Sequence, residues 1–195
     1  MNNLDFVTNG RKIYTLAGND WYAVEQNDSK VMLVDTDGKV AGEELRTPWS
    51  YAKSCYEKTA TNGQCVLDYI NNIAEQYFSS IKYAIIPRNI NCLNKQNVGD
   101  GELKNAYMWA MSYEEIIQNK KVSDILVRNV EECIWTRTFS ETYFQCNCAL
   151  SMCISNASLS SSSDSVTIKL AVAPAFYLDK SAIKSISKNG EIILK

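Results

Sequence analysis

The sequence predicts an α+β fold in one domain, with antiparallel strands and two helices. Short β-favouring runs separated by turn residues open and close the chain, and segments with helical periodicity lie between them. Strand and helix do not alternate regularly, and there is no fixed-period repeat and no linker-like Pro/Gly tract. A length of 195 residues suits one domain spanning residues 1–195.

The N-terminal part is predicted to be a small antiparallel meander. In "RKIYTLAGNDWYAVEQNDSKVMLVDTDGKV", β-favouring residues such as Ile13, Trp21 and Val31 are separated by "GND", "QNDS" and "DTDG", which are turn sequences.

Two helices are expected next. Thr47 is a candidate N-cap, with Pro48 in the first helical position of "PWSYAKSCYEKT". In "CVLDYINNIAEQYF", one face carries Val66, Ile70 and Ile73, a pattern typical of core packing.

The remaining elements are assigned by short signals. We expect a strand in "IKYAIIPRNI" ending near Pro87, and a polar loop in "NCLNKQNVGDGELKNA" with a turn at "GDG". In "YMWAMSYEEIIQNKK" a strand precedes a helix, for which Ser112 and Glu115 have capping-box spacing. Further strands are predicted in "ECIWTRTF" and in "VTIKLAVAPAFYL", the latter with Pro174 near its end, and Asn189-Gly190 predicts a type I′ hairpin.

Charge and hydropathy argue against two classes of partner. The formal net charge is −2, without a basic block, so nucleic acid and anionic membrane surfaces are not expected partners. No apolar run approaches the roughly 18 residues of a membrane span, and the N-terminus lacks the pattern of a secretory signal peptide. The expected location is cytoplasmic, unless the chain belongs to a virion or is carried to a cell surface by other means.

Catalysis is not expected. The chain has no histidine, which removes Ser-His, Cys-His and His-metal chemistry. Adjacent glutamates, as at Glu114-Glu115, do not face the same way and are interpreted as solvated. Neither phosphate-binding glycine motif occurs, so no cofactor is predicted.

No metal site is expected either. The seven cysteines do not form C-x-x-C pairs, and reduced, mostly buried thiols are favoured over disulfides or a metal site. The segment "DTDGK" resembles the start of a calcium loop, but it lacks the later glutamate and lies where a hairpin turn is expected.

The segment "SETYFQCNCALSMCISNASLSSSSDS" is the candidate binding surface. Tyr and Phe supply rigid contact area, while Ser and Asn supply adaptable hydrogen bonds. The alternative is an ordinary serine-rich loop and strand. The predicted ligand-binding residues are Arg137, Ser140, Tyr143, Phe144, Asn147, Ser151, Asn156 and Ser158.

The order of "YMWAMSYEE", "WTRT" at residues 135–138, a polar segment and then "VAPA" at residues 172–175 is specific. It resembles a family of C-type-lectin-like domains of unassigned function from gut bacteria and their phages, and the similarity covers nearly the whole chain. The chain departs from the family pattern at Ala173, where the family has Arg, and in lacking the second Trp and the "SP" of the tryptophan motif.

The resemblance implies a C-type-lectin-like fold and a role in binding. Relatives in fold include phage receptor-binding proteins and the variable proteins of diversity-generating retroelements, in which selected codons near the C-terminus are mutated. Positions such as Tyr143, Asn147 and Ser151 carry residue types that this process produces, whereas Gln145 and Met152 would stay fixed. The copper-dependent formylglycine-generating enzymes share the fold, but their framework motifs are not visible here.

The predicted function is therefore non-catalytic binding of a protein or glycan ligand, as a phage receptor-binding or diversified variable protein. The alternative is a structural virion or surface-assembly protein that uses the domain for contacts in a homo-oligomer or with other virion subunits. An enzyme is the third and least favoured hypothesis.

Overall fold

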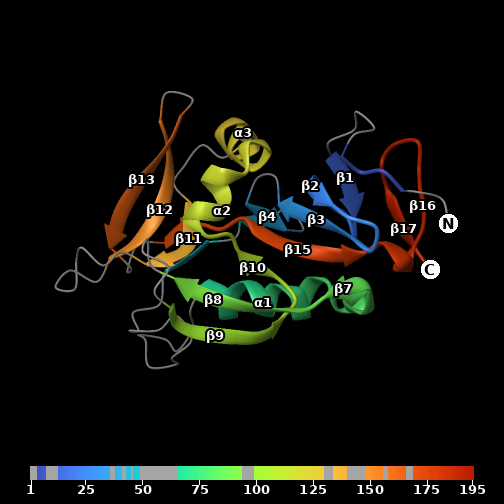
Figure 1. The fold of residues 1–195 in the computed structure, drawn as a ribbon, viewed down its shortest axis with the longest axis horizontal. Coiled ribbons are helices and arrows are strands. Elements are labelled where there is room, and N and C mark those ends of the chain that lie inside the picture. The colour runs from blue at the N-terminus through green and yellow to red at the C-terminus, as the bar shows by residue number, and fades with distance from the viewer. Residues whose placement is uncertain are drawn as a thin grey trace.

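The computed structural model describes residues 4–7, 13–35, 38–40, 43–44, 46–48, 66–93, 99–129, 134–139, 148–155, 158–165 and 169–195. It is an α+β structure in which nearly all strand pairs are antiparallel, as predicted. A central sheet in the order β1-β2-β3-β15-β10, with β7 also paired to β15, lies beside a second sheet in the order β13-β12-β11-β14-β6 (Figure 1).

The central sheet begins with the predicted meander. Its strands are β1 (Ile13–Leu16), β2 (Asn19–Gln26) and β3 (Lys30–Asp35). The first turn is the two-residue loop Ala17-Gly18, in which both residues have positive φ, 51° and 76°. That combination matches the right-handed twist of a hairpin.

The sheet is completed from the distant C-terminal part of the chain. β15 (Pro174–Asp179) pairs with β3 from Ala175 to Asp179, and also with β7 (Ile85–Ile86) and β10 (Trp109–Ala110). The middle of the sheet therefore consists of two strands that lie at opposite ends of the sequence.

The second sheet contains the segment proposed for binding. β12 (Cys148–Ser155) and β13 (Ser158–Ser165) form a hairpin, and β12 also pairs with β11 (Ile134–Phe139). β11 is parallel to β14 (Lys169–Ala171), which pairs with β6 (Arg46–Pro48). The hairpin projects from the end of the molecule away from the two termini (Figure 1).

The helices follow the local signals where these are strong. α1 (Val66–Tyr77) buries Ile70 and Ile73, as its periodicity predicts. α2 (Tyr113–Gln118) begins with the predicted capping box: the Ser112 side chain accepts from the Glu115 amide, and the Glu115 carboxylate accepts from the Ser112 amide. α3 (Lys120–Asn129) was not predicted.

Near the first helices one prediction is wrong and another is correct only in part. Thr47 and Pro48 do not start a helix, because both belong to β6 and pair with β14; the rest of that predicted helix lies outside the described residues. The strand predicted in "IKYAIIPRNI" is present only as β7 (Ile85–Ile86), which does end just before Pro87. The residues before it belong to a 3-10 helix (Ser79–Ala84), and β8 (Arg88–Leu93) follows the proline.

Three further predictions are wrong because strand pairing overrides the local signal. β8 pairs with β9 (Gly99–Ala106), so "GDG" lies in a strand and not in a turn. Pro174 begins β15 and does not end a strand that continues from β14. "DTDG" leads from β3 to β4 (Lys39–Val40), which pairs with β5 (Glu43–Glu44) and not with β3.

The C-terminal hairpin is present but has a different turn. β16 (Ile183–Ile186) pairs with β17 (Ile192–Leu194), and Gly190 has a φ of 91°. Asn189 is not among the described non-glycine residues of positive φ, so the turn is not type I′. The Gly190 amide donates to the Ser187 carbonyl, as in a longer hairpin loop that ends in a left-handed glycine.

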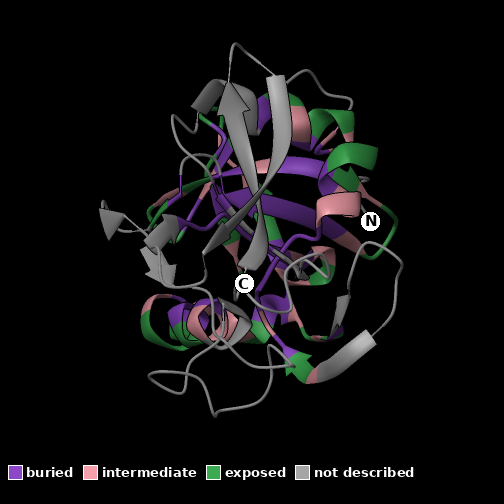
Figure 2. Ribbon diagram, turned by 90° about the vertical axis from the view of Figure 1, so that its left-hand side faces the viewer, coloured by how far each residue is buried: buried purple, intermediate pink, exposed green. Residues whose placement is uncertain are grey.

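Buried apolar residues form one cluster that extends from Phe6 to Ile192. The Trp21 ring lies edge-on to Phe78 and Phe176, with centroids 5.5 Å and 4.8 Å away, and its indole N–H donates to the Leu16 carbonyl. Figure 2 shows buried segments through the middle of the molecule and exposed ones on its outer helices. Among the described helices, none is long and apolar enough to cross a membrane.

Candidate functional site

A cavity of about 500 Å³ lies between the central sheet and the junction of α2 and α3. Its floor includes Val24, Met32 and Met111, while charged side chains from β2, β8 and the helical junction complete the wall. The volume is within the range typical of small-molecule sites. The lining is more polar than is usual for such sites, because most of its residues are charged or carry amides and only Val24, Met32, Met111 and the Tyr177 ring offer apolar surface.

A β-bulge positions the sheet side of this cavity. Ala23 pairs with Leu33 and Glu25 pairs with Met32, so Val24 is an extra residue in β2. Because bulges change the direction in which following side chains point, the insertion places Glu25 in one cross-strand row with Met32 and Tyr177. The three side chains consequently share a face and reach the same cavity.

Tyr177 is the aromatic centre of the site. Its hydroxyl donates to the Glu25 carboxylate at 2.5 Å, and the Lys30 ammonium lies 3.6 Å from the centroid of its ring. Desolvation by burial, followed by the hydrogen bond to Glu25 and the negative charge of that carboxylate, raises the pKa of Tyr177 to about 12. At neutral pH the phenol is therefore a hydrogen-bond donor and cannot act as a general base.

Arg88 enters the cavity from the start of β8. Its guanidinium lies 4.8 Å from the centroid of the Trp109 ring and 5.8 Å from that of the Tyr177 ring. The two rings are themselves 5.4 Å apart at an interplanar angle of 48°. Stacking on aromatic faces holds a guanidinium in place while leaving the N–H groups at its edge able to donate.

The helical junction supplies the opposite wall. Lys120 and Lys121 begin α3 and are exposed at the cavity. The Asn119 side-chain oxygen accepts from the Val122 amide at 3.3 Å, as an N-cap does. Glu115 also lines the cavity, but its carboxylate is engaged by the Ser112 amide.

Trp109, next to this site, has an unusual environment. It is fully buried, and its indole N–H is the buried side-chain polar atom without a hydrogen-bond partner in the described part of the chain. Buried indole N–H groups usually find an acceptor. The ring contacts both the Arg88 guanidinium and the Tyr177 ring, so it supports the two side chains of the cavity.

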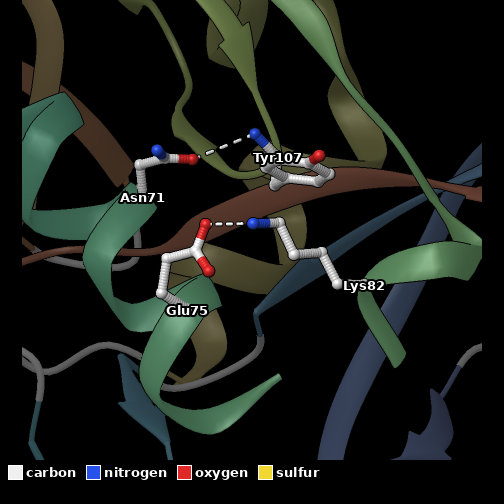
Figure 3. Close-up of polar contacts among 4 residues, drawn as sticks. All are labelled: Asn71, Glu75, Lys82 and Tyr107. Carbon is white, nitrogen blue, oxygen red and sulfur yellow. Dashed lines mark hydrogen bonds and ion pairs between the residues drawn. The ribbon is translucent and has the colours of Figure 1, made fainter. Parts of the chain in front are cut away.

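A second polar cluster joins α1 to the segments that carry Lys82 and Tyr107, and its role is structural. Figure 3 shows Asn71 and Glu75 of α1 facing Tyr107 and Lys82. The Asn71 side chain accepts from the Tyr107 amide at 3.0 Å, Lys82 pairs with Glu75, and the Lys82 ammonium lies 4.2 Å from the centroid of the Tyr107 ring. These contacts attach the loop between β9 and β10 to the helix.

Of the residues predicted to bind ligand, three lie in described strands. Arg137 is in β11, Ser151 in β12 and Ser158 in β13, each described by its backbone alone. The other five lie outside the described residues, namely Ser140, Tyr143, Phe144, Asn147 and Asn156.

Strand register divides the hairpin into two kinds of position. Met152 is opposite Ile134, which is buried, and shares its face with the other even-numbered positions of β12. Ser151 is opposite both Trp135 and Ser162, and Ser155 is opposite Ser158, so these belong to the other face. On that face β13 contributes only Ser158, Ser160, Ser162 and Asp164.

The cavity was missed at the level of sequence because its residues form no motif. Tyr177 lies in "VAPAFYL", which was interpreted as a core strand, and Glu25 and Arg88 are isolated charges. The pair Lys120-Lys121 was no usable signal either, because positive charge there is unusual only at a helix start and the start of α3 was not predicted.

Metal ligands do not gather in the described residues, which contain no group of three or more Cys, Asp or Glu side chains suited to a metal ion. Asp35, the first residue of the calcium-like segment, is buried, and its carboxylate accepts from the Gly38 amide at 2.6 Å. Comparisons of the chain with protein-family models, curated proteins and solved structures found no match.

Proposed function

We propose that this chain is a ligand- or receptor-binding module on a C-type-lectin-like scaffold and that it performs no catalysis. The observation that carries the proposal is the cavity, in which Arg88 and Tyr177 are held by stacking and by the bond to Glu25. Pre-organised polar groups over an apolar floor favour binding, because little side-chain entropy is lost when the ligand arrives.

The scaffold assignment is supported by the order of elements. The three stretches that resemble the family fall on β10 and α2, on β11, and on the start of β15. Pro174 and Ala175 pair with Ala110 and Trp109, so the first and last of these stretches are neighbours in the sheet. The phage receptor-binding or variable-protein role, with location on a virion or cell surface, follows from this scaffold and is part of the proposal.

The hairpin is proposed as a second, variable recognition surface. Register supports this, since Met152, expected to stay fixed, is opposite buried Ile134, whereas Ser151 and Ser155 lie on the other face. Sequencing the coding region of residues 135–177 across the source population tests it. We expect substitutions at Tyr143, Asn147, Ser151 and Asn156, with Trp135 and Pro174 constant; a uniform substitution rate would show that the hairpin is not diversified.

Binding in the cavity is tested by protein-detected NMR with a library of small polar fragments. Binders should shift the backbone amides of Lys120 and Lys121 and the ring signals of Tyr177, while amides of the remote hairpin β16–β17 stay unchanged. If no fragment perturbs the cavity signals, the cavity is not a ligand site and the proposal loses its main support.

A structural assembly protein is the second candidate, and one observation favours it. β13 is the edge strand of its sheet among the described strands, has eight residues, and contains neither Pro nor Lys. Edge strands without such protection pair readily with other chains. Light scattering of the wild type and of Ser161→Pro decides: an oligomer that dissociates in the variant supports assembly, whereas a monomeric wild type argues against self-assembly.

A further inference from the structure

We propose that the cavity selects small organic monocarboxylates, which Arg88 anchors through its guanidinium. This inference rests on the proposed ligand-binding function and names the chemical class of the ligand. It does not depend on the hairpin or on the scaffold assignment.

The first argument is the state of Arg88. Within the described part of the chain, its guanidinium contacts the Trp109 and Tyr177 rings but makes no hydrogen bond or ion pair. A half-buried guanidinium with free donors beside a cavity is an incomplete site. Its planar fork matches a carboxylate, which can accept two parallel hydrogen bonds from it.

The second argument is the charge balance of the cavity wall. Arg88, Lys120 and Lys121 are cationic, while Glu25 and Glu115 are the anionic residues. Both carboxylates already accept hydrogen bonds, from the Tyr177 hydroxyl and from the Ser112 amide. The lining therefore carries an excess of positive charge, and the Lys30 ammonium on the Tyr177 ring adds to it, so the site favours an anionic ligand.

The third argument concerns the two lysines. Both occupy the first turn of α3, where the helix dipole is positive and no acidic residue compensates it. This placement is unfavourable in the free protein and becomes favourable when an anion lies at the helix start. The lysines therefore add to the electrostatic attraction for an anionic ligand, while Arg88 fixes the position of its carboxylate.

The apolar floor defines the rest of the ligand. Met32 and Met111 adapt to irregular shapes, and the Tyr177 ring offers a flat surface beside them. A carboxylate attached to a ring, such as an aromatic acid or a sugar acid, would place its ring on this floor and its charge against Arg88.

The experiment uses matched probes that differ only at the anionic group. The affinities of the full-length chain for benzoate and benzamide, and for glucuronate and glucuronamide, are measured by NMR titration at low salt. We expect each acid to bind at least about tenfold more tightly than its amide, because hydrogen bonds to a charged group are stronger than those to a neutral one. Inorganic phosphate should compete weakly.

Two variants separate specific anchoring from general charge. Arg88→Met keeps an apolar chain on Trp109 and should remove the preference for the acids. Lys120→Gln, at an exposed position, should weaken acid binding a few-fold, and its matched control Lys184→Gln, an exposed lysine of β16, should leave binding unchanged.

The outcomes distinguish this inference from the function on which it rests. Amides that bind as tightly as the acids, phosphate that binds more tightly, or acid binding that survives Arg88→Met would each overturn monocarboxylate selection while leaving a ligand site in place. If neither acids, amides nor the wider fragment library shift the cavity signals, both the inference and the cavity's role in binding are wrong.

Discussion

At the scale of single residues, Tyr177 shows how its neighbours set the chemistry of a side chain. A bulge at Val24 directs the Glu25 side chain toward the Tyr177 phenol, although Glu25 and Tyr177 are 152 positions apart in the sequence. The result is a phenol that donates to a carboxylate beside a cation, an arrangement suited to holding an aromatic surface and not to proton transfer.

Titration of Tyr177 checks this arrangement. Its pKa of about 12 lies above the ordinary value of 10.0, so the stability that the neutral phenol contributes is complete below pH 10 and is lost as pH rises through 12. The phenolate absorbance of wild type minus Tyr177→Phe should titrate near pH 12. Glu25→Gln should lower the pKa of Tyr177 toward 10; a wild-type difference curve centred near 10 would contradict the contact.

The turn between β1 and β2 gives a second prediction for a single residue. Ala17 has a φ of 51°, which an L-residue adopts at a cost of roughly 1–2 kcal/mol. Ala17→Gly should raise the free energy of unfolding by roughly 0.5–1 kcal/mol after the added freedom of the unfolded glycine is subtracted. Urea denaturation measures the change.

Gly18→Ala is the matched control. A Cβ at Gly18 would meet no atom within 4 Å, so any loss of stability reflects backbone strain alone at its φ of 76°. We expect a loss of about 1 kcal/mol. Destabilisation by Ala17→Gly would mean that the turn does not have positive φ at both positions.

At the scale of elements, α2 is the clearest case of a local sequence signal that positions one wall of the cavity. The capping box fixes where the helix begins and thereby where Gln118 and Asn119 meet the cavity. Ser112→Ala should lower the free energy of unfolding by about 1 kcal/mol, because the Glu115 amide loses its acceptor.

Two variants serve as controls for the cap. Glu115→Gln keeps an acceptor at the position where the motif accepts either residue, and should be within about 0.5 kcal/mol of wild type in urea denaturation. Ser185→Ala, at an exposed position of β16, should be neutral. Equal stability of Ser112→Ala and wild type would show that the box does not hold the helix.

At the scale of the whole molecule, one aromatic junction joins the sheet to α1. Phe78, fully buried just after the helix, meets Trp21, which in turn meets Phe176 of β15. The junction links three segments that are distant in sequence. Loss of its packing should therefore lower the stability of the whole described core.

Phe78→Ala should lower the free energy of unfolding by about 3–5 kcal/mol through lost burial and a cavity. Tyr83→Ala, at a side chain that is 63% exposed, should lower the free energy of unfolding much less.

Calorimetry of the wild type should give one cooperative transition, as a single domain predicts. Two separated transitions would contradict the prediction of one domain.

How much was predictable depends on the range of the interactions involved. The meander, α1, the capping box of α2 and the C-terminal hairpin were predicted from periodicity and cap residues. The helix at Thr47-Pro48 was wrong because pairing with β14 outweighed a helix-start signal. α3 was missed because the helix predicted after Ser112 was extended through Lys121, past the break at Asn119 that separates α2 from α3.

The sequence alone determined the α+β class and the local elements with strong signals, such as α1 and the capping box of α2, since periodicity and cap residues act between near neighbours. Only the tertiary structure decided that β15 lies beside β3 and that Glu25, Arg88 and Tyr177 meet at one cavity. The reason is physical: strand order and bulge register are selected by packing between distant segments, and no local pattern in the chain encodes them.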